Sequence, residues 1–523
     1  MSWEKYSRLL FYDEGTGLAV DPSQAAWPEG LLRPDRAETR HAWQEMMNLE
    51  KGAIANPSEQ RMVGHYWLRA PELAPTAALT AEIRETLSRI DKFAAAVHSG
   101  AVRGGRGAPF RRVVVVGIGG SSLGPRFVSR ALGTGADKMR LYFVDNTDPD
   151  GMDRVWAAVK PELAETLTVV ISKSGGTVET RNGMEEARLF YEAAGLDFAR
   201  HAVRITQRGS KLDAAAADWL EFFPMWDWVG GRTSVFSAVG LLPLTLQGID
   251  AAALLRGAAA VDALTRRPAP AENPALLTAL VWQALTGGRG GTQMVILPYK
   301  DRLDLLAQYA QQLVMESLGK EKDRDGRVVH QGLAVFGNKG SSDQHSYVQQ
   351  LLAGPDNFFA LLIEVLRDRE GESPVVGENS TSGDYLQAFL LGTRRALRAR
   401  GRNSITVTLP AADAPSVGGL IALLERAVGY YASLVNVNAY DQPAVEMGKK
   451  SAGEIIALKN DVLAALNRQP ERSFTAAALA EAVGRPEETE TVFQLLRRLA
   501  ANGRVEGIGR GLSGEFRAAG GSL

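Results

Sequence analysis

A strand, a short loop and a helix are predicted one after another between residues 167 and 194, and this unit strongly constrains the fold. Residues 167–171 form a mainly apolar, β-branched run that is typical of a buried strand, and residues 178–194 have a helical pattern. Similar runs at 113–116 and 141–145 are separated by helical segments. Short apolar strands that alternate with crossover helices predict a parallel, doubly wound α/β sheet.

The loop between this strand and helix is rich in hydroxyl groups and glycine. Gly175 and Gly176 allow backbone N–H groups to approach a ligand, and the positive end of the following helix favours an anion. Such a loop fits a phosphate monoester held by neutral donors. The alternative is a capped turn, in which the hydroxyl groups only satisfy the helix terminus. The hydroxyl-bearing residues are Ser172, Ser174, Thr177 and Thr180.

A second glycine-rich corner follows the strand at 113–116. Residues 117–122 read Gly-Ile-Gly-Gly-Ser-Ser, and Asp145 ends the next strand, where an acid could bind a ribose. A dinucleotide fingerprint would require glycine where Ser122 stands, and Ser121 suits a sugar-phosphate site at least as well. Ligands of doubly wound sheets bind at the carboxyl ends of the strands, so both corners are expected at the functional edge.

A second region of alternating strands and helices is predicted after residue 286. Its strands are expected at 292–297, 335–337 and 405–409. The 523 residues are enough for about three domains. The predicted parts are a helical N-terminal segment (1–105), a first domain with connecting helices (106–285), a second domain (286–454) and a small module with a winged-helix-like order of elements (455–523).

Composition excludes several classes of partner. Lysine and arginine number 59, aspartate and glutamate 60, so no net field attracts nucleic acid or an anionic membrane. Even the C-terminal stretch 459–517 has nine basic and eight acidic residues, which is poor for a DNA-binding face. The absence of cysteine excludes disulfides and thiolate nucleophiles and fits a reducing compartment. Without a leader-like start or an uninterrupted apolar run, a cytoplasmic location is expected.

Two further residues are candidates for chemistry because of the loops that precede them. Paired glycines at 230–231 can present Arg232 to a ligand, although a structural turn with a surface arginine is the commoner case. His345 follows a glycine- and serine-rich loop, where an imidazole suits acid-base catalysis. None of the six histidines lies in a metal-binding pattern, so no metal site is expected.

A helix predicted over 303–318 carries a polar stripe. Gln308, Gln312 and Glu316 are spaced at i, i+4 and i+8 and would share one face. Such a stripe is usually the solvent-exposed side of a helix. Here the stripe also reaches the end of the helix, where Gly319 can act as a C-cap.

Six motifs, taken together and in order, resemble the phosphoglucose isomerase family. They cover residues 117–449, and the N-terminal hundred residues and the C-terminal tail match less well. The motifs are Gly117-Ile-Gly-Gly-Ser121-x-Leu-Gly-Pro125, Ser172-Lys173-x-x-x-Thr177-x-Glu-Thr180, Gly231-Arg232-x-Ser234, Gln312-x-x-Met-Glu316-Ser-x-Gly-Lys320, Gln344-His345 and Asp441-Gln442-x-x-x-Glu446-x-Gly448-Lys449.

This resemblance implies two flavodoxin-like sugar isomerase (SIS) domains and a homodimer whose active sites use residues of both subunits. It implies a hexose 6-phosphate substrate and no cofactor. Glu316 would be the base, Arg232 and Gln312 would line the reacting carbons, and His345 and Lys449 would serve ring opening. Gln442 would contact the substrate. The residues implied to bind the phosphate and neighbouring hydroxyls are Gly119, Gly120, Ser121, Ser172, Lys173, Ser174, Thr177 and Thr180.

The implied reaction is the aldose-ketose isomerisation of glucose 6-phosphate and fructose 6-phosphate through a cis-enediol. One alternative is a sugar-phosphate sensor without catalysis, which would use the C-terminal module for regulation. Another is a dinucleotide-dependent oxidoreductase built on the 117–122 corner. The family often has a bulky residue and threonine where this chain has Gly175 and Gly176, so the range of substrates stays open.

Overall fold

The chain forms two compact units, Met1–Asp441 and Gln442–Leu523. The computed structural model describes residues 3–509 and 511–519, and only the backbone of residues 445–447 and 449. None of the helices in these ranges combines the length and apolar character that a membrane span needs. The predicted division into four parts stays a prediction, because the compact units separate the chain at one point only.

The first unit contains two sheets with a parallel core, and the first of these has five strands in the order β6-β5-β7-β8-β9. All neighbouring strands are parallel, which gives the strand order 2-1-3-4-5 of flavodoxin-like folds. The predicted strands at 113–116, 141–145 and 167–171 are therefore confirmed. Their bounds are β5 (Arg112–Val116), β6 (Arg140–Val144), β7 (Thr166–Ser172), β8 (Ala202–Thr206) and β9 (Glu221–Pro224).

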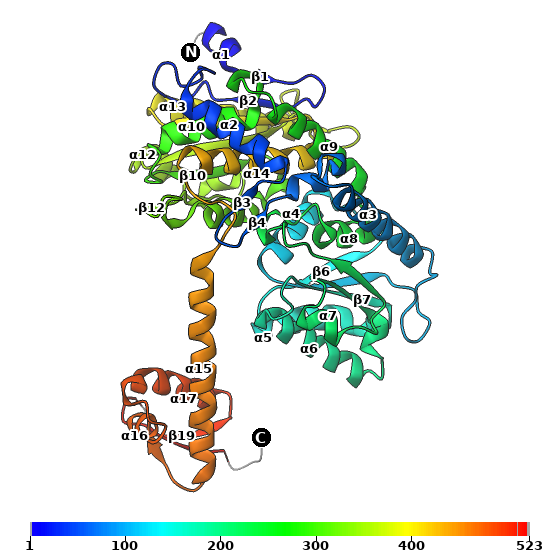
Figure 1. Ribbon diagram of the computed structural model, residues 1–523, viewed down its shortest axis with the longest axis vertical. Helices are drawn as coiled ribbons and strands as arrows, with labels where there is room; N and C mark the ends of the chain where they lie inside the picture. Colours follow the sequence, from blue (N-terminus) through cyan, green and yellow to red (C-terminus); the bar gives the residue numbers. More distant parts are fainter. Residues whose placement is uncertain (1–2, 510, 520–523) are drawn as a thin grey trace. The chain divides into compact units, whose positions relative to one another are not determined.

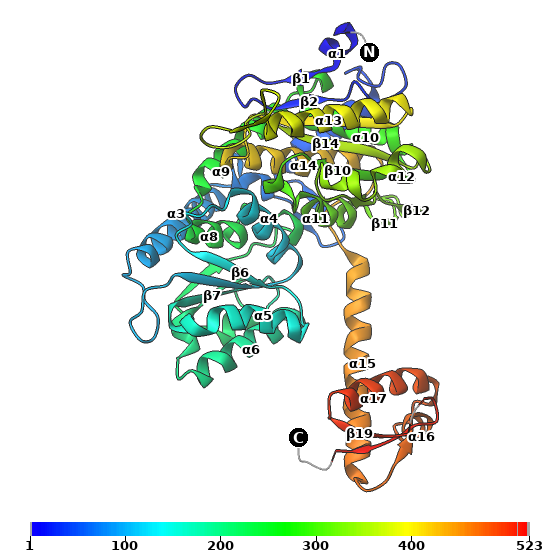
Figure 2. The ribbon, with the colours of Figure 1, turned by 180° about the vertical axis from the view of Figure 1, so that it is seen from behind.

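Helices cover both faces of this sheet (Figures 1 and 2). Because side chains alternate along a strand, Val113 and Val115 pack on one side with α4 and α8. Val114 and Val116 pack on the other side with α5 and α6. The expected doubly wound arrangement is thus present. The helices are α4 (Leu123–Leu132), α5 (Pro149–Val159), α6 (Val178–Ala193), α7 (Lys211–Ala215) and α8 (Ala238–Gln247).

The second sheet has the order β1-β2-β17-β14-β10-β13. Strands β13, β10, β14 and β17 are parallel and repeat the order 2-1-3-4, while β2 pairs antiparallel with β17. Strand β14 is absent from the predicted strands, because periodicity alone does not distinguish a short, uniformly apolar run from a buried helix. The bounds are β1 (Phe11–Tyr12), β2 (Ala19–Asp21), β10 (Gln293–Pro298), β13 (Val335–Phe336), β14 (Phe358–Val365) and β17 (Asn403–Leu409).

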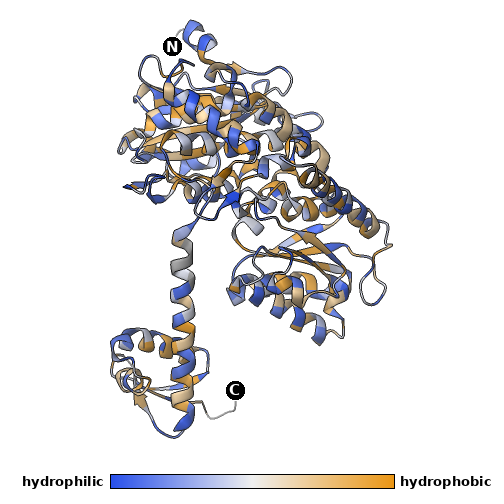
Figure 3. Ribbon diagram, in the orientation of Figure 1, coloured by the Kyte–Doolittle hydropathy of each residue, from blue (hydrophilic) through white to orange (hydrophobic). Residues whose placement is uncertain are grey.

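Helices also pack on both faces of the second sheet. Leu297 and Leu362 contact the side of α12 and α13, whereas Ile296 and Leu361 face the core that contains α10 and α14. Figure 3 shows the hydrophobic residues gathered in the strands and on the inner sides of the helices. The helices are α10 (Pro274–Thr286), α12 (Val348–Ala353), α13 (Ser382–Ala399) and α14 (Ala414–Leu434).

The N-terminal segment is only partly helical, which corrects the sequence-based expectation. It contains α1 (Trp3–Leu9), α2 (Ala37–Glu50) and α3 (Ala77–His98), but β1 and β2 belong to the second sheet, and β3 (Ile54–Asn56) pairs with β4 (Arg61–Met62). These strands have two or three residues each, too few for a period-two pattern. They form by pairing with strands elsewhere or in a local hairpin.

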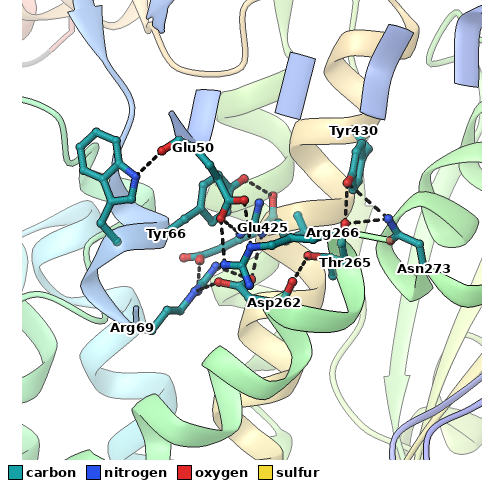
Figure 4. A network of polar contacts seen from close by, with 11 residues as sticks. Glu50, Tyr66, Arg69, Asp262, Thr265, Arg266, Asn273, Glu425 and Tyr430 are labelled. Carbon is teal, nitrogen blue, oxygen red and sulfur yellow. Dashed lines mark hydrogen bonds and ion pairs between the residues drawn. The ribbon is translucent and has the colours of Figure 1, made fainter. Parts of the chain in front are cut away.

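A buried ionic network fixes the N-terminal segment to the helices of the second sheet (Figure 4). Arg69 lies 2.6 Å from carboxylate oxygens of both Asp262, on α9 (Ala251–Thr265), and Glu425, on α14. Arg426 bridges Asp262 to Glu50 at the end of α2. Because breaking a buried ion pair costs about 3–5 kcal/mol, this network holds the three segments in one arrangement.

The second unit has a small core of its own. Leu458, Leu479 and Leu496 are buried together with residues of a three-stranded antiparallel sheet of order β18-β20-β19. The unit consists of helices and short strands, and its identification as a winged-helix module stays a prediction. The elements are α15 (Pro443–Arg468), β18 (Phe474–Thr475), α16 (Ala476–Ala482), α17 (Thr489–Ala501), β19 (Val505–Ile508) and β20 (Glu515–Ala518).

Candidate active site

The loops at 117–122 and 230–234 are in backbone contact at the carboxyl edge of the first sheet. A Cβ atom placed on Gly120 would lie 1.9 Å from the carbonyl oxygen of Gly231, so only glycine fits there. Ser234 Oγ also lies 3.4 Å from the carbonyl oxygen of Gly120. The two glycine-rich motifs thus form one surface, which carries Ser121 on one side and Arg232 on the other.

The loop after β7 borders a cavity of about 230 Å³ lined by Ser172, Gly176, Thr177 and Thr180. Thr177 is the N-cap residue of α6, but among the described residues its side chain makes no capping hydrogen bond to the first turn. The Thr180 hydroxyl is buried without a hydrogen-bond partner in the described part of the chain. Thr177 Oγ1 accepts a hydrogen bond from Ser172 Oγ at 3.3 Å. Donors at the start of α6 and the O–H groups of Thr177 and Thr180 remain available to an anion, and the phosphate site stays a prediction.

Gly175 is required by the shape of this loop. Its φ is +65°, and a Cβ atom there would lie 2.4 Å from the backbone nitrogen of Leu212 at the start of α7. A side chain would have to displace backbone atoms, in a conformation that already disfavours L-residues. Ser174 is exposed, and its Oγ accepts a hydrogen bond from Gly176 N at 3.2 Å, so it shapes the loop.

Lys173 belongs to the same loop, but it is not one of the residues that line the cavity. Its Nζ donates to the carbonyl oxygens of Asp227 at 3.0 Å and Val229 at 2.9 Å. Burial, with Arg61 nearby, lowers the pKa of Lys173 to about 8. The ammonium group therefore supports the segment that leads to Arg232, and its predicted phosphate contact stays a prediction.

Asp145, the acid that a dinucleotide site would use, is occupied by protein groups. Ser122 Oγ donates to Asp145 Oδ2 at 2.9 Å, and Arg126 Nη1 lies 2.6 Å from the same oxygen. Ser122, which breaks the dinucleotide fingerprint, thus binds the carboxylate that a ribose would need. The geometry gives no support to a nicotinamide cofactor at this corner.

The helix that carries Glu316 is irregular, which corrects the expected continuous α-helix over 303–318. A 3-10 helix and α11 (Leu306–Ala310) are followed by a π-helix, Gln311–Glu316. The wider turn breaks the i, i+4, i+8 stripe. Gln308 is exposed, whereas the Gln312 side chain lies against Gly119, with its Nε2 3.1 Å from where a Cβ atom would stand.

Glu316 and Arg232 face each other at the end of this π-helix. Arg232 Nη1 lies 3.6 Å from Glu316 Oε2, and Arg232 Nε donates to Ser317 Oγ at 2.8 Å. Arg232 is 5% exposed, and burial lowers its pKa. Within the described residues, Glu316 Oε2 is buried without a hydrogen-bond partner, so it is available as a proton acceptor.

The remaining predicted residues are His345, Gln442 and Lys449. His345 is exposed at the end of a 3-10 helix, Ser342–His345, and no hydrogen bond or ion pair in the described ranges connects it to Glu316. Its loop is fixed by Asp343, which accepts hydrogen bonds from Asn338 N and Lys339 N at 3.0 Å. Gln442 opens the second unit, and the side chain of Lys449 lies outside the described residues.

Three residues at the site had no predicted role. Ser317 binds Arg232, while Lys320 and Asp441 form an ion pair of 2.9 Å beside it. All three lie inside the quoted motifs: Ser317 and Asp441 are each next to a predicted site residue, and Lys320 is four residues after Glu316. This closeness in sequence could have marked them as candidates, but it does not show which atoms are in contact.

The comparisons with known proteins agree with the motifs. Residues 34–359 match the family described as phosphoglucose isomerase. The chain belongs to the phosphoglucose isomerase family. The curated glucose-6-phosphate isomerase of Desulfitobacterium hafniense (strain Y51) is 57% identical over 503 residues, which are 96% of this chain and 94% of that protein. A protein of the same name from Geobacter sp. (strain M21) is 58% identical, over 96% of this chain and 95% of its own length.

Solved structures support the family assignment. The crystal structure of a glucose-6-phosphate isomerase from Chlamydia trachomatis D/UW-3/Cx has a TM-score of 0.80 at 28% identity and covers 88% of this chain and 92% of that chain. A hypothetical protein from Thermus thermophilus has a TM-score of 0.70, also at 28% identity, with 84% of this chain and all of that chain covered. The resemblance inferred from the six motifs is confirmed.

Proposed function

We propose that this phosphoglucose isomerase family member interconverts glucose 6-phosphate and fructose 6-phosphate through a cis-enediol intermediate. The observation that carries the proposal is the Glu316–Arg232 pair, 3.6 Å apart, in which Arg232 is buried and Glu316 partly buried, at the edge formed by the glycine-rich corners. A carboxylate oxygen without a hydrogen-bond partner among the described residues, Glu316 Oε2, and a guanidinium beside it supply a base and a positive charge. The names of the 51–58% identical relatives support the same activity.

Glu316 would move the proton between C2 and C1. An aldose and its 2-ketose differ by one proton on carbon and one on oxygen, so one base that accepts and returns a proton is sufficient. As the proton leaves, negative charge develops on the enediolate oxygens. Arg232 would stabilise that charge, and such a preorganised donor contributes about 3 kcal/mol or more. Gln312, next to Gly119, would line the reacting carbons.

The loop after β7 would hold the phosphate at the far end of the sugar. Ser172, Thr177 and Thr180 line its cavity, and the start of α6 supplies donors and a positive helix end. Binding energy from the phosphate, which does not react, would keep C1 and C2 at Glu316. Ser121 would contribute a further hydroxyl group from the neighbouring corner.

Ring opening would require a second copy of the chain. His345 is exposed on a fixed loop, which suits an imidazole that enters the active site of a partner subunit. We place His345 and Lys449 at the ring oxygen and the anomeric hydroxyl, and Gln442 at the substrate. The enzyme would be a cytoplasmic homodimer with shared active sites.

The sensor alternative has less support. Sugar-phosphate binding alone would not require the pair formed by Glu316 and Arg232. The C-terminal module, with nine basic and eight acidic residues between 459 and 517, lacks the positive charge that most duplex-binding modules carry.

The first experiment is the conversion of fructose 6-phosphate to glucose 6-phosphate, followed through a coupled dehydrogenase. Glu316→Gln is expected to lower kcat about 100-fold or more at similar KM, because the base is lost and the shape is kept. Glu321→Gln, at an exposed position five residues later, is the matched control. Turnover of Glu316→Gln close to that of the wild type would refute the assignment of the base.

Mixed dimers test the shared site. His345→Ala is expected to lose more activity with cyclic substrate than with an open-chain analogue, whereas His41→Ala, on the exposed side of α2, should change neither. Mixing Glu316→Gln with His345→Ala subunits should restore about a quarter of wild-type activity, since half of randomly formed dimers contain one intact site of two. No recovery after subunit exchange would place both residues in one subunit.

A further inference from the structure

The last residues of the first unit, 439–441, lie against the Arg232 side chain. Arg232 Nη2 donates to the carbonyl oxygen of Ala439 and, at 3.0 Å, to that of Asp441. With Nε bound to Ser317 at 2.8 Å, three contacts fix the plane of the guanidinium. The direction in which Nη1 faces Glu316 therefore depends on where this short segment lies.

Asp441 is in turn held by Lys320. Lys320 Nζ lies 2.9 Å from Asp441 Oδ1, and it donates to the carbonyl oxygen of Asp441 at 2.6 Å. The same ammonium donates to the carbonyl oxygen of Glu316 at 3.1 Å. The Lys320 side chain is 5% exposed, so these contacts are made away from solvent. One buried lysine thus connects the segment that orients Arg232 to the end of the π-helix that carries Glu316.

These contacts close a ring of four residues. Glu316 faces Arg232, and Arg232 donates to the carbonyl oxygen of Asp441. The Asp441 carboxylate forms an ion pair with Lys320, and Lys320 donates to the carbonyl oxygen of Glu316. A shift of the guanidinium relative to the carboxylate would have to stretch the Lys320–Asp441 pair. Breaking a buried pair is unfavourable, because one charge is left without compensation.

The N-terminal segment supports the ring from another side. Ser58 Oγ lies 3.0 Å from Asp441 Oδ2, and Asn438 Nδ2 donates to Asn56 Oδ1 at 3.1 Å. Asn56 ends β3 and is buried. The loop between β3 and β4, for which the sequence predicted no chemistry, therefore holds the segment that contacts Arg232.

We propose that Lys320 and Asp441 are positioning residues, whose ion pair, supported by Ser58, holds the Arg232 guanidinium in place beside Glu316. The inference rests on the proposed isomerase function and adds to it residues that do not touch the substrate. Charge on the enediolate develops only as the proton is transferred. Misplacing Arg232 should therefore lower kcat and leave the binding of the ground-state substrate nearly unchanged.

The test compares Asp441→Asn and Lys320→Met with the wild-type enzyme. Each is expected to lower kcat about 10- to 100-fold, the scale of a displacement of about 1 Å at a reacting centre. KM should stay within about twofold, since the phosphate site is untouched. A five-carbon phosphorylated aldonate, whose planar carboxylate stands in for the enediolate, should lose affinity by the same factor as kcat/KM, while inorganic phosphate should bind as before.

Three controls separate positioning from general loss of structure. Asp304→Asn breaks the exposed Arg130–Asp304 pair of 3.0 Å and should leave kcat unchanged. Lys320→Arg keeps a positive charge and should recover part of the activity that Lys320→Met loses. The double variant should be little worse than the poorer single variant, because both changes break one interaction.

The outcomes distinguish this inference from the proposed function. A wild-type enzyme that does not convert fructose 6-phosphate would refute the function, and the inference with it. An active wild type with Asp441→Asn turnover within about twofold of it would overturn the inference alone, as would equal losses of phosphate and aldonate affinity. If Asp441→Asn does not fold, equal activity of Lys320→Met and Lys320→Arg would overturn it instead. Losses seen with cyclic but not open-chain substrate would also overturn it, because Arg232 acts after ring opening.

Discussion

In each parallel sheet of the first unit, the third parallel strand in chain order is followed by a connection, here called a corner, that leads into a helix. The two corners differ in the side chains that surround the start of that helix. In the first sheet, β7 leads into α6 through a loop of hydroxyl groups and glycine. In the second, β14 leads into α13 through a longer connection that contains the short hairpin β15 (Val375–Gly377) and β16 (Ser380–Thr381). The strand order that places them is the same.

The second corner is closed to anions by its own side chains. Thr381 and Asp384 form a capping box, in which each side chain accepts a hydrogen bond from the backbone of the other at 2.7–3.2 Å. Glu364, Asp368 and Asp384 line a cavity of about 120 Å³ beside it. The donors of α13 that could bind a phosphate are partly used, and the surrounding charge is negative.

The comparison separates what the fold supplies from what the local sequence supplies. A doubly wound sheet places a helix N-terminus at the carboxyl end of its strands in both cases. Whether that terminus binds an anion depends on an uncapped first turn and a close glycine backbone. Only the first corner meets both conditions, so the chain is expected to bind one hexose phosphate per subunit, at the first sheet.

The largest expected effect comes from giving the first corner the charge of the second. Thr177→Asp should fold normally, because aspartate is a good N-cap residue. Its carboxylate would face the substrate phosphate, and juxtaposed like charges cost several kcal/mol, so KM for fructose 6-phosphate should rise about 100-fold or more. Steady-state kinetics at fixed ionic strength measure the change.

The matched variant is Thr381→Asp at the N-cap of α13. It places the same charge at the equivalent position of the second corner and should leave KM within about twofold of wild type, since no substrate group is expected there. Comparable increases in KM from both variants would show that the substrate phosphate does not bind selectively at the first corner.

Much of this comparison could be predicted from the sequence. The strand at 167–171, the loop with Ser172 and Thr177, and the helix that follows are visible in residue type and periodicity, because each is specified by a short stretch of chain. The same holds for the glycine corner at 117–122. The family resemblance then connected these stretches in the correct order.

The parts that could not be predicted depend on contacts between distant segments. The π-helix at Gln311–Glu316 has no signature in an apolar pattern that fits an α-helix equally well. The direction of Lys173 is set by carbonyl groups more than fifty residues away, at Asp227 and Val229. The neighbours of His345 in a dimer depend on a second chain, which a single sequence does not describe.

A lysine beside each corner gives a second, smaller test. Lys173 supports the first corner, and Lys300 donates to the carbonyl oxygens of Arg367 and Asp368 in the second. Burial lowers the pKa of Lys173 from 10.5 to about 8, so between these values the unfolded chain binds more protons than the folded chain. The unfolding free energy of the wild type should therefore rise relative to Lys173→Met by about 1–2 kcal/mol from pH 7.5 to 9.5.

Urea unfolding across this pH range measures the difference. Burial lowers the pKa of Lys300 less than that of Lys173, so the difference between wild type and Lys300→Met should change in the same direction by a smaller amount. A flat difference for Lys173→Met would mean that its ammonium keeps an ordinary pKa in the folded enzyme.

The smallest effects, about 1 kcal/mol each, come from removing one hydroxyl group at the two N-cap threonines. Thr381→Ala breaks a capping box and should lower the unfolding free energy by that amount without changing KM. Thr177 makes no capping hydrogen bond within the described residues, so Thr177→Ala should cost little stability. It should instead raise KM about fivefold, through the loss of one hydrogen bond to phosphate. If Thr177→Ala proved as destabilising as Thr381→Ala and left KM unchanged, Thr177 would be an ordinary N-cap residue. The proposal that the first corner binds the substrate phosphate would then be refuted.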